Sequence, residues 1–63
     1  MKRLRVLVVD DHTLVRQGIE RILSMHADHL EVVGLAANGT QAITKARQLE
    51  PDVILMDIHM PGI

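Results

Sequence analysis

Three short apolar runs, separated by two amphipathic stretches, constrain the fold of this chain more than any other feature. The runs cover residues 4–9, 30–36 and 53–56. The first is compact and rich in valine, with Arg5 as its one charged residue, and such a run is typical of a strand buried on both faces of a parallel sheet. The order strand, helix, strand, helix, strand implies parallel strands joined by right-handed crossovers. We therefore expect an α/β fold with one or both sheet faces covered by a helix.

The two segments between the runs carry the pattern of amphipathic helices. The first covers about residues 13–25, with apolar side chains at helical spacing at Val15, Ile19, Ile22 and Leu23. Glu20 lies four residues after Arg16, a spacing that allows a weak surface pair. The second helix is expected to begin after Asn38, which forms a loose capping-box pattern with Gln41, and to end before Pro51.

Composition narrows the class of protein. The 63 residues allow one domain, and its core must be aliphatic, because the chain has no cysteine, phenylalanine, tyrosine or tryptophan. Seven basic residues against eight acidic ones give no support for nucleic-acid binding by this segment. No apolar run is long enough for a secretory signal or a membrane span. We expect a cytoplasmic protein with no membrane partner.

The most informative polar residues are three aspartates that follow predicted strands. Asp10 and Asp11 come directly after the first strand, and Asp57 comes directly after the third. Ligands of open α/β sheets bind outside the carboxyl ends of the strands. If these two strands are neighbours, the three carboxylates converge and need a cation to offset their repulsion. Oxygen ligands of this kind suit Mg²⁺.

Such a site could also carry out chemistry, because a carboxylate can act as a nucleophile and form an aspartyl-phosphate. Asp57 would then be the nucleophile, and Asp10 and Asp11 would position Mg²⁺, with Asp11 the more direct ligand. A structural alternative exists for each residue, because aspartates after strands are common in turns and helix caps. The aspartates after the first strand and the aspartate after the third occur together in one alternating order of strands and helices, which favours a functional site over separate structural roles.

At this point the sequence resembles the receiver domain of two-component response regulators. The resemblance rests on the apolar run ending in Asp10-Asp11-His12, on Asn38-Gly39, and on the stretch from Pro51 to Gly62 that contains Asp57 and Met60-Pro61-Gly62. It covers essentially the whole chain. The segment from His12 to Gly18 is similar to the subgroup whose receivers precede a LuxR-type helix-turn-helix domain.

The resemblance implies a truncated flavodoxin-like (CheY-like) fold with three parallel strands in the order 2-1-3. It implies phosphorylation of Asp57 by a sensor histidine kinase. Asp11, Asp57 and the backbone carbonyl of His59 would bind Mg²⁺, supported by Asp10. In a full-length relative, phosphorylation would control dimerisation and DNA binding for transcription.

The family's later strands, with a hydroxyl residue and a phosphate-contacting lysine, and its DNA-binding output domain have no counterpart in residues 1–63. We therefore interpret the chain as the N-terminal half of a receiver, which is not itself an enzyme and contacts DNA only through an absent domain. The third strand would then be an exposed apolar edge, and such edges pair with other chains. This predicts a homo-oligomer. The alternative function is a folded, self-associating fragment without signalling activity.

Two further interpretations remain open. A haloacid-dehalogenase-like phosphatase also uses an aspartyl-phosphate, but that family has two aspartates separated by one residue, whereas Asp10 and Asp11 are adjacent.

The four histidines lack metal-binding spacing. His26 and His29 are expected in a loop, and His12 either lines the rim of the acidic pocket or simply starts the first helix.

Overall fold

A computed structural model describes residues 3–56 of the chain, and residues 1–2 and 57–63 lie outside the description. The elements follow in the order β1 (Leu4–Val9), α1 (Thr13–Ser24), β2 (Leu30–Ala36), α2 (Gly39–Leu49) and β3 (Val53–Met56). The three strands and two helices predicted from the apolar pattern are therefore confirmed, with ends that agree to within a residue or two.

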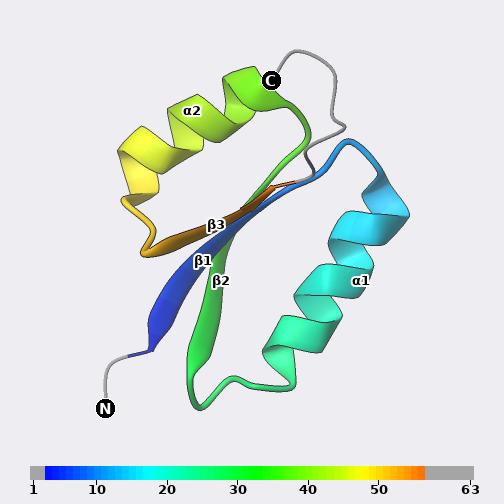
Figure 1. Ribbon diagram of the computed structural model, residues 1–63, viewed down its shortest axis with the longest axis vertical. Helices are drawn as coiled ribbons and strands as arrows, with labels where there is room; N and C mark the ends of the chain where they lie inside the picture. Colours follow the sequence, from blue (N-terminus) through cyan, green and yellow to red (C-terminus); the bar gives the residue numbers. More distant parts are fainter. Residues whose placement is uncertain (1–2, 57–63) are drawn as a thin grey trace.

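The strands form one parallel sheet in the order β2-β1-β3, with β1 in the centre (Figure 1). Helix α1 and helix α2 pack on opposite faces of this sheet, so the chain has three layers. Both helices contact β1 and β2, whereas β3 contacts β1 alone among the described elements. The predicted fold class and strand order are confirmed.

The core is built around the central strand. The four residues from Val6 to Val9 are each at most 2% exposed, and the core also includes Ala36 and Ala42. Alternate residues of a strand point to opposite faces, and Leu7 and Val9 form the cluster with Ala42 of α2. Residues Val6 to Val9 of the run thus form a strand segment buried on both faces, as predicted, whereas Leu4 at the start of the strand is 49% exposed.

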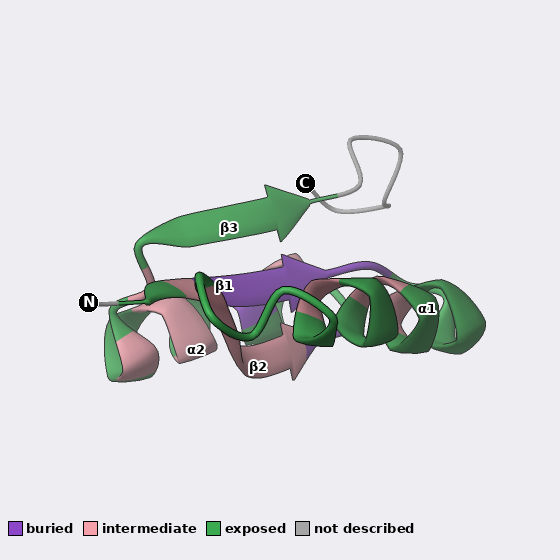
Figure 2. Ribbon diagram, turned by 90° about the horizontal axis from the view of Figure 1, so that it is seen from below, coloured by how far each residue is buried: buried purple, intermediate pink, exposed green. Residues whose placement is uncertain are grey.

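Strand β3 is far less covered than its neighbour, as Figure 2 shows by its green colour above the buried β1. All four of its side chains are between 36% and 43% exposed. On α1, Ile19 and Leu23 are half-buried, whereas Val15 and Ile22 remain 44% and 59% exposed. The apolar stripe of α1 is therefore only partly buried, because α1 packs on β1 and β2 and does not reach β3.

Candidate functional site

The acidic pair lies in the turn that connects β1 to α1, at the carboxyl end of the sheet. The Asp10 N–H still belongs to the sheet, because it donates to the Ala36 carbonyl at 3.0 Å. The chain then leaves the sheet at Asp11 and enters α1 through His12, which has an extended backbone conformation as the N-cap residue. Asp10 is thus buried, at 6% exposure, while Asp11 is exposed.

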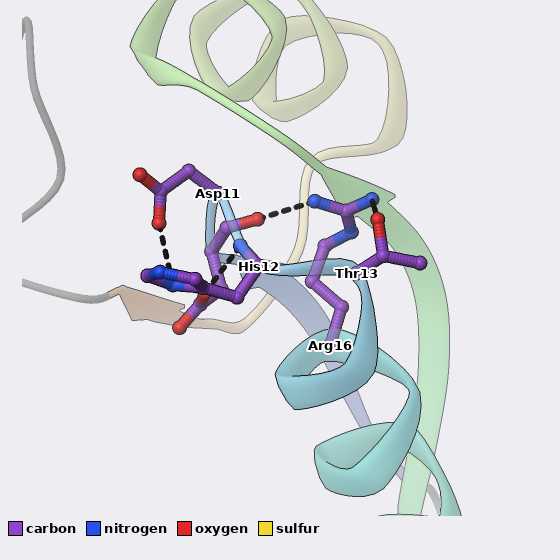
Figure 3. Close-up of polar contacts among 5 residues, drawn as sticks. Asp11, His12, Thr13 and Arg16 are labelled. Atoms are coloured by element: carbon purple, nitrogen blue, oxygen red, sulfur yellow. Dashed lines mark hydrogen bonds and ion pairs between the residues drawn. The ribbon is translucent and has the colours of Figure 1, made fainter.

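His12 holds the two carboxylates together (Figure 3). Its ring Nδ1 lies 2.8 Å from Asp11 Oδ1 and 3.2 Å from Asp10 Oδ1. Its backbone N–H also donates to Asp10 Oδ1 at 2.8 Å, which satisfies the buried carboxylate locally. Of the roles considered for His12, the helix-entry role is present, because the residue precedes α1 as its N-cap, and its ring also contacts the acidic pair.

Arg16 anchors the turn from the first turn of α1. Its guanidinium donates to the Asp10 backbone carbonyl at 2.6 Å and to the Thr13 hydroxyl at 3.2 Å. The surface pair that the spacing of Arg16 and Glu20 allows is not formed, since no ion pair joins them within residues 3–56. The guanidinium instead takes a partly buried carbonyl, where a charge-assisted hydrogen bond is stronger than an exposed helical pair. No sequence pattern indicates this contact, because it depends on the path of the turn.

The donor set of this turn suits a divalent cation. Asp10, Asp11 and His12 each offer one ligand atom, and these atoms lie within 4.8 Å of one another. Two carboxylate oxygens this close together fit a hard cation such as Mg²⁺, which binds through one or two carboxylates and keeps several waters. The predicted ligands Asp57 and His59 lie outside the described residues, so the structure brings together Asp10 and Asp11 only.

A hollow of about 420 Å³ opens beside the acidic turn, between α1 and β3. It is lined by Asp10, by Ile19 of α1 and by Leu55 and Met56 of β3, among others. A larger hollow of about 770 Å³ lies between α1 and β2. We place the candidate site at the smaller one, because binding sites of parallel sheets lie at the carboxyl ends of the strands and the buried residue Asp10 lines this hollow.

Comparison with known proteins agrees with a candidate site at the carboxyl end of the parallel sheet. Residues 6–63 match the family of response regulator receiver domains. The chain is 60% identical over 60 residues to the response regulator GacA of Pseudomonas viridiflava, covering 95% of this chain and 28% of that protein. The chain therefore belongs to the receiver domain family of two-component response regulators, and this match favours a receiver over the phosphatase considered above.

Two solved structures show the same fold. The signal receiver domain of the putative response regulator NarL from Mycobacterium tuberculosis superposes with a TM-score of 0.90 at 41% identity, covering all of this chain and 50% of that one. RcsB from Salmonella enterica serovar Typhimurium, bound to the promoter rprA with the phosphomimetic BeF₃⁻, superposes with a TM-score of 0.86 at 30% identity. That match covers 95% of this chain and 29% of RcsB. The chain thus spans about half, or less, of the proteins it matches.

Proposed function

We propose that this chain is the phosphoacceptor portion of a response regulator receiver, and that Asp57 accepts the phosphoryl group from a sensor histidine kinase. The observation that carries the proposal is the strand register. Val9 at the end of β1 pairs with Met56 at the end of β3. The residues that follow this pair are Asp10 and Asp57. Their position after paired residues of parallel strands supports a shared site at one edge of the sheet.

In the proposed reaction, an oxygen of the Asp57 carboxylate forms a bond to phosphorus. The bond between phosphorus and the donor, a histidine nitrogen of the kinase, breaks and its electron pair stays on that nitrogen. Asp11, Asp57 and the His59 carbonyl would hold Mg²⁺, with Asp10 supporting them. When bound, the ion would neutralise the charge of the transferring phosphoryl group and orient it. Asp10, fixed by His12 and buried, keeps the turn in place.

A role in transcription is proposed for the full-length protein. The solved RcsB structure is bound to a promoter in the presence of a phosphomimetic, which supports the view that phosphorylation in this family is coupled to DNA binding. The chain has seven basic and eight acidic residues, so DNA contact is assigned to an output domain outside residues 1–63. We accordingly propose that these residues correspond to the N-terminal half of a receiver domain.

The phosphoacceptor proposal is tested by incubating the chain with acetyl phosphate and Mg²⁺ and measuring its intact mass. We expect the gain of one phosphoryl group, which Asp57→Asn removes. Asp28→Asn is the matched control, because Asp28 is an exposed residue of the loop between α1 and β2. An unchanged mass for the wild-type chain, or an equal gain in Asp57→Asn, would refute the assignment.

We propose separately that the chain self-associates through β3. This strand forms one edge of the sheet among the described residues, and its four apolar side chains are all at least 36% exposed. An exposed apolar edge can pair with the same edge of a second copy. Sedimentation velocity should show a dimer or larger species that Leu55→Lys disrupts. The control Leu14→Lys changes an 82% exposed leucine on α1 and should leave association intact. A wild-type monomer at high concentration would contradict the proposal.

A further inference from the structure

Asp10 is fixed at each of its polar groups, whereas Asp11 is not. The Asp10 N–H donates to Ala36, its carboxylate accepts from His12, and its carbonyl accepts from Arg16. The side chain of Asp11 has one polar contact within residues 3–56, to the neighbouring ring of His12, and that ring is itself 67% exposed. The direction of the Asp11 carboxylate therefore depends on the backbone that carries it.

The Asp10 carbonyl belongs to the planar peptide unit that leads into Asp11. Arg16 donates to this carbonyl at 2.6 Å and holds the Thr13 hydroxyl with its other terminal nitrogen. In Figure 3 the Arg16 side chain extends from α1 back over the turn, with Asp11 and His12 on the other side. A carbonyl held in this way resists rotation, and its peptide plane sets the direction of the N–Cα bond from which the Asp11 side chain branches.

We propose that Arg16 is a positioning residue of the cation site, which fixes the Asp10–Asp11 peptide so that the Asp11 carboxylate is presented to a divalent cation. The inference rests on the metal site of the proposed function. Arg16 itself touches neither cation nor phosphoryl group in this account. Residues that orient metal ligands through a hydrogen bond commonly change metal affinity by roughly 10–100-fold when they are removed.

The charge of Arg16 makes the proposal easy to distinguish from a purely electrostatic effect. A guanidinium near the site repels a cation, so removing its charge alone should strengthen Mg²⁺ binding. Loss of the hydrogen bond that positions Asp11 should instead weaken Mg²⁺ binding. Arg16→Met removes both the charge and the donor, whereas Arg16→Gln removes the charge but keeps an amide N–H that can donate to the carbonyl.

The test is a titration of the chain with Mg²⁺. Binding is measured in NMR spectra from the chemical shifts of the backbone amides in the β1–α1 turn. We expect Arg16→Met to weaken binding by roughly tenfold or more, and Arg16→Gln to recover part of that loss. Arg21→Met is the matched control, because it removes the same charge from an exposed position of α1, and its affinity should change little.

Unchanged or tighter binding in Arg16→Met would overturn the inference, as would a wild-type chain that does not bind Mg²⁺. If Arg16→Met does not fold, Arg16→Leu takes its place, because leucine also lacks both the charge and the donor, and an affinity equal to or tighter than wild type then refutes the role. This readout needs no phosphoryl transfer. Arg16-dependent Mg²⁺ binding in a chain that acetyl phosphate cannot phosphorylate would therefore support the inference while refuting the proposed function.

Discussion

Replacing Leu7 by alanine tests whether β1 is the structural centre of this chain. Leu7 is fully buried and belongs to the cluster between the sheet and α2. Its Cδ1 lies 3.3 Å from the point where a Cβ would stand on Gly34 of the neighbouring strand. Gly34 has no side chain to fill the vacated space, and Leu49, whose Cδ1 lies 2.7 Å from the same point, should fill only part of it, so a cavity remains. We expect a loss in the middle of the range for buried leucines, about 3 kcal/mol.

That loss is large for a chain of this size. Small cores rarely supply more than about 3–5 kcal/mol of stability, and about 3 kcal/mol lowers the folding equilibrium roughly a hundredfold. About 2 kcal/mol or less would then remain, so the Leu7→Ala chain should be only marginally folded at room temperature and should unfold at a much lower urea concentration than wild type. Urea titration followed by far-UV circular dichroism measures this, since the chain has no tryptophan or tyrosine to report by fluorescence.

Leu14→Ala provides the matched control, because Leu14 is 82% exposed on α1. Its change in unfolding free energy should stay within about 0.5 kcal/mol, as for other surface substitutions. The reasoning would be refuted if Leu7→Ala and Leu14→Ala shifted the urea midpoint by similar amounts, because burial at β1 would then not dominate stability.

Three further substitutions test local features of the fold and site. Glu50 ends α2 in the left-handed region, with φ of 48°, so Glu50→Gly should raise the unfolding free energy by about 1 kcal/mol, and a lower urea midpoint would contradict this. Asn38→Ala removes the cap on the Gln41 N–H at 2.8 Å and should cost about 1 kcal/mol, whereas unchanged thermal unfolding would count against it. Asp11→Asn should weaken Mg²⁺ binding measured by calorimetry, which equal affinity would rule out.

The strands were predictable because their signal is local. The apolar part of the first run, Val6–Val9, needs burial on both faces, and the structure provides it through a helix on each side of the sheet. The start of α2 was also readable, since Asn38 caps the helix as its pattern indicates. The capping box differs in one detail: the Gln41 side chain accepts from the Ala37 N–H, one residue before the cap.

The contacts that depend on three-dimensional paths were not predictable. Arg16 could be seen from the sequence only as a surface partner for Glu20, because nothing local shows that the Asp10 carbonyl turns toward α1. A second example is Asp52, whose carboxylate accepts from the Arg5 N–H at 2.8 Å across 47 positions of the chain. Spacing can place the carboxylates at the ends of strands, but the hydrogen bonds that orient them follow from the turn geometry.

A related difference concerns the apolar stripe of α1. Helical spacing marks Val15 and Ile22 as core residues, yet both remain exposed. Periodicity identifies the face that a helix would bury, but the amount of burial depends on what the sheet presents to that face. Here the helix packs on β1 and β2, and β3 contacts neither helix within the described residues.

The most direct test of the account is to identify the residue that carries the phosphoryl group. An aspartyl-phosphate is an acyl phosphate, which borohydride reduces to the alcohol, so a phosphorylated aspartate is recovered as homoserine. The chain should be treated with acetyl phosphate and Mg²⁺, reduced, digested and sequenced by mass spectrometry. We predict homoserine at position 57 and unmodified aspartate at positions 10 and 11. Homoserine at either of those two positions, or at none, would contradict the assignment of Asp57 as the acceptor.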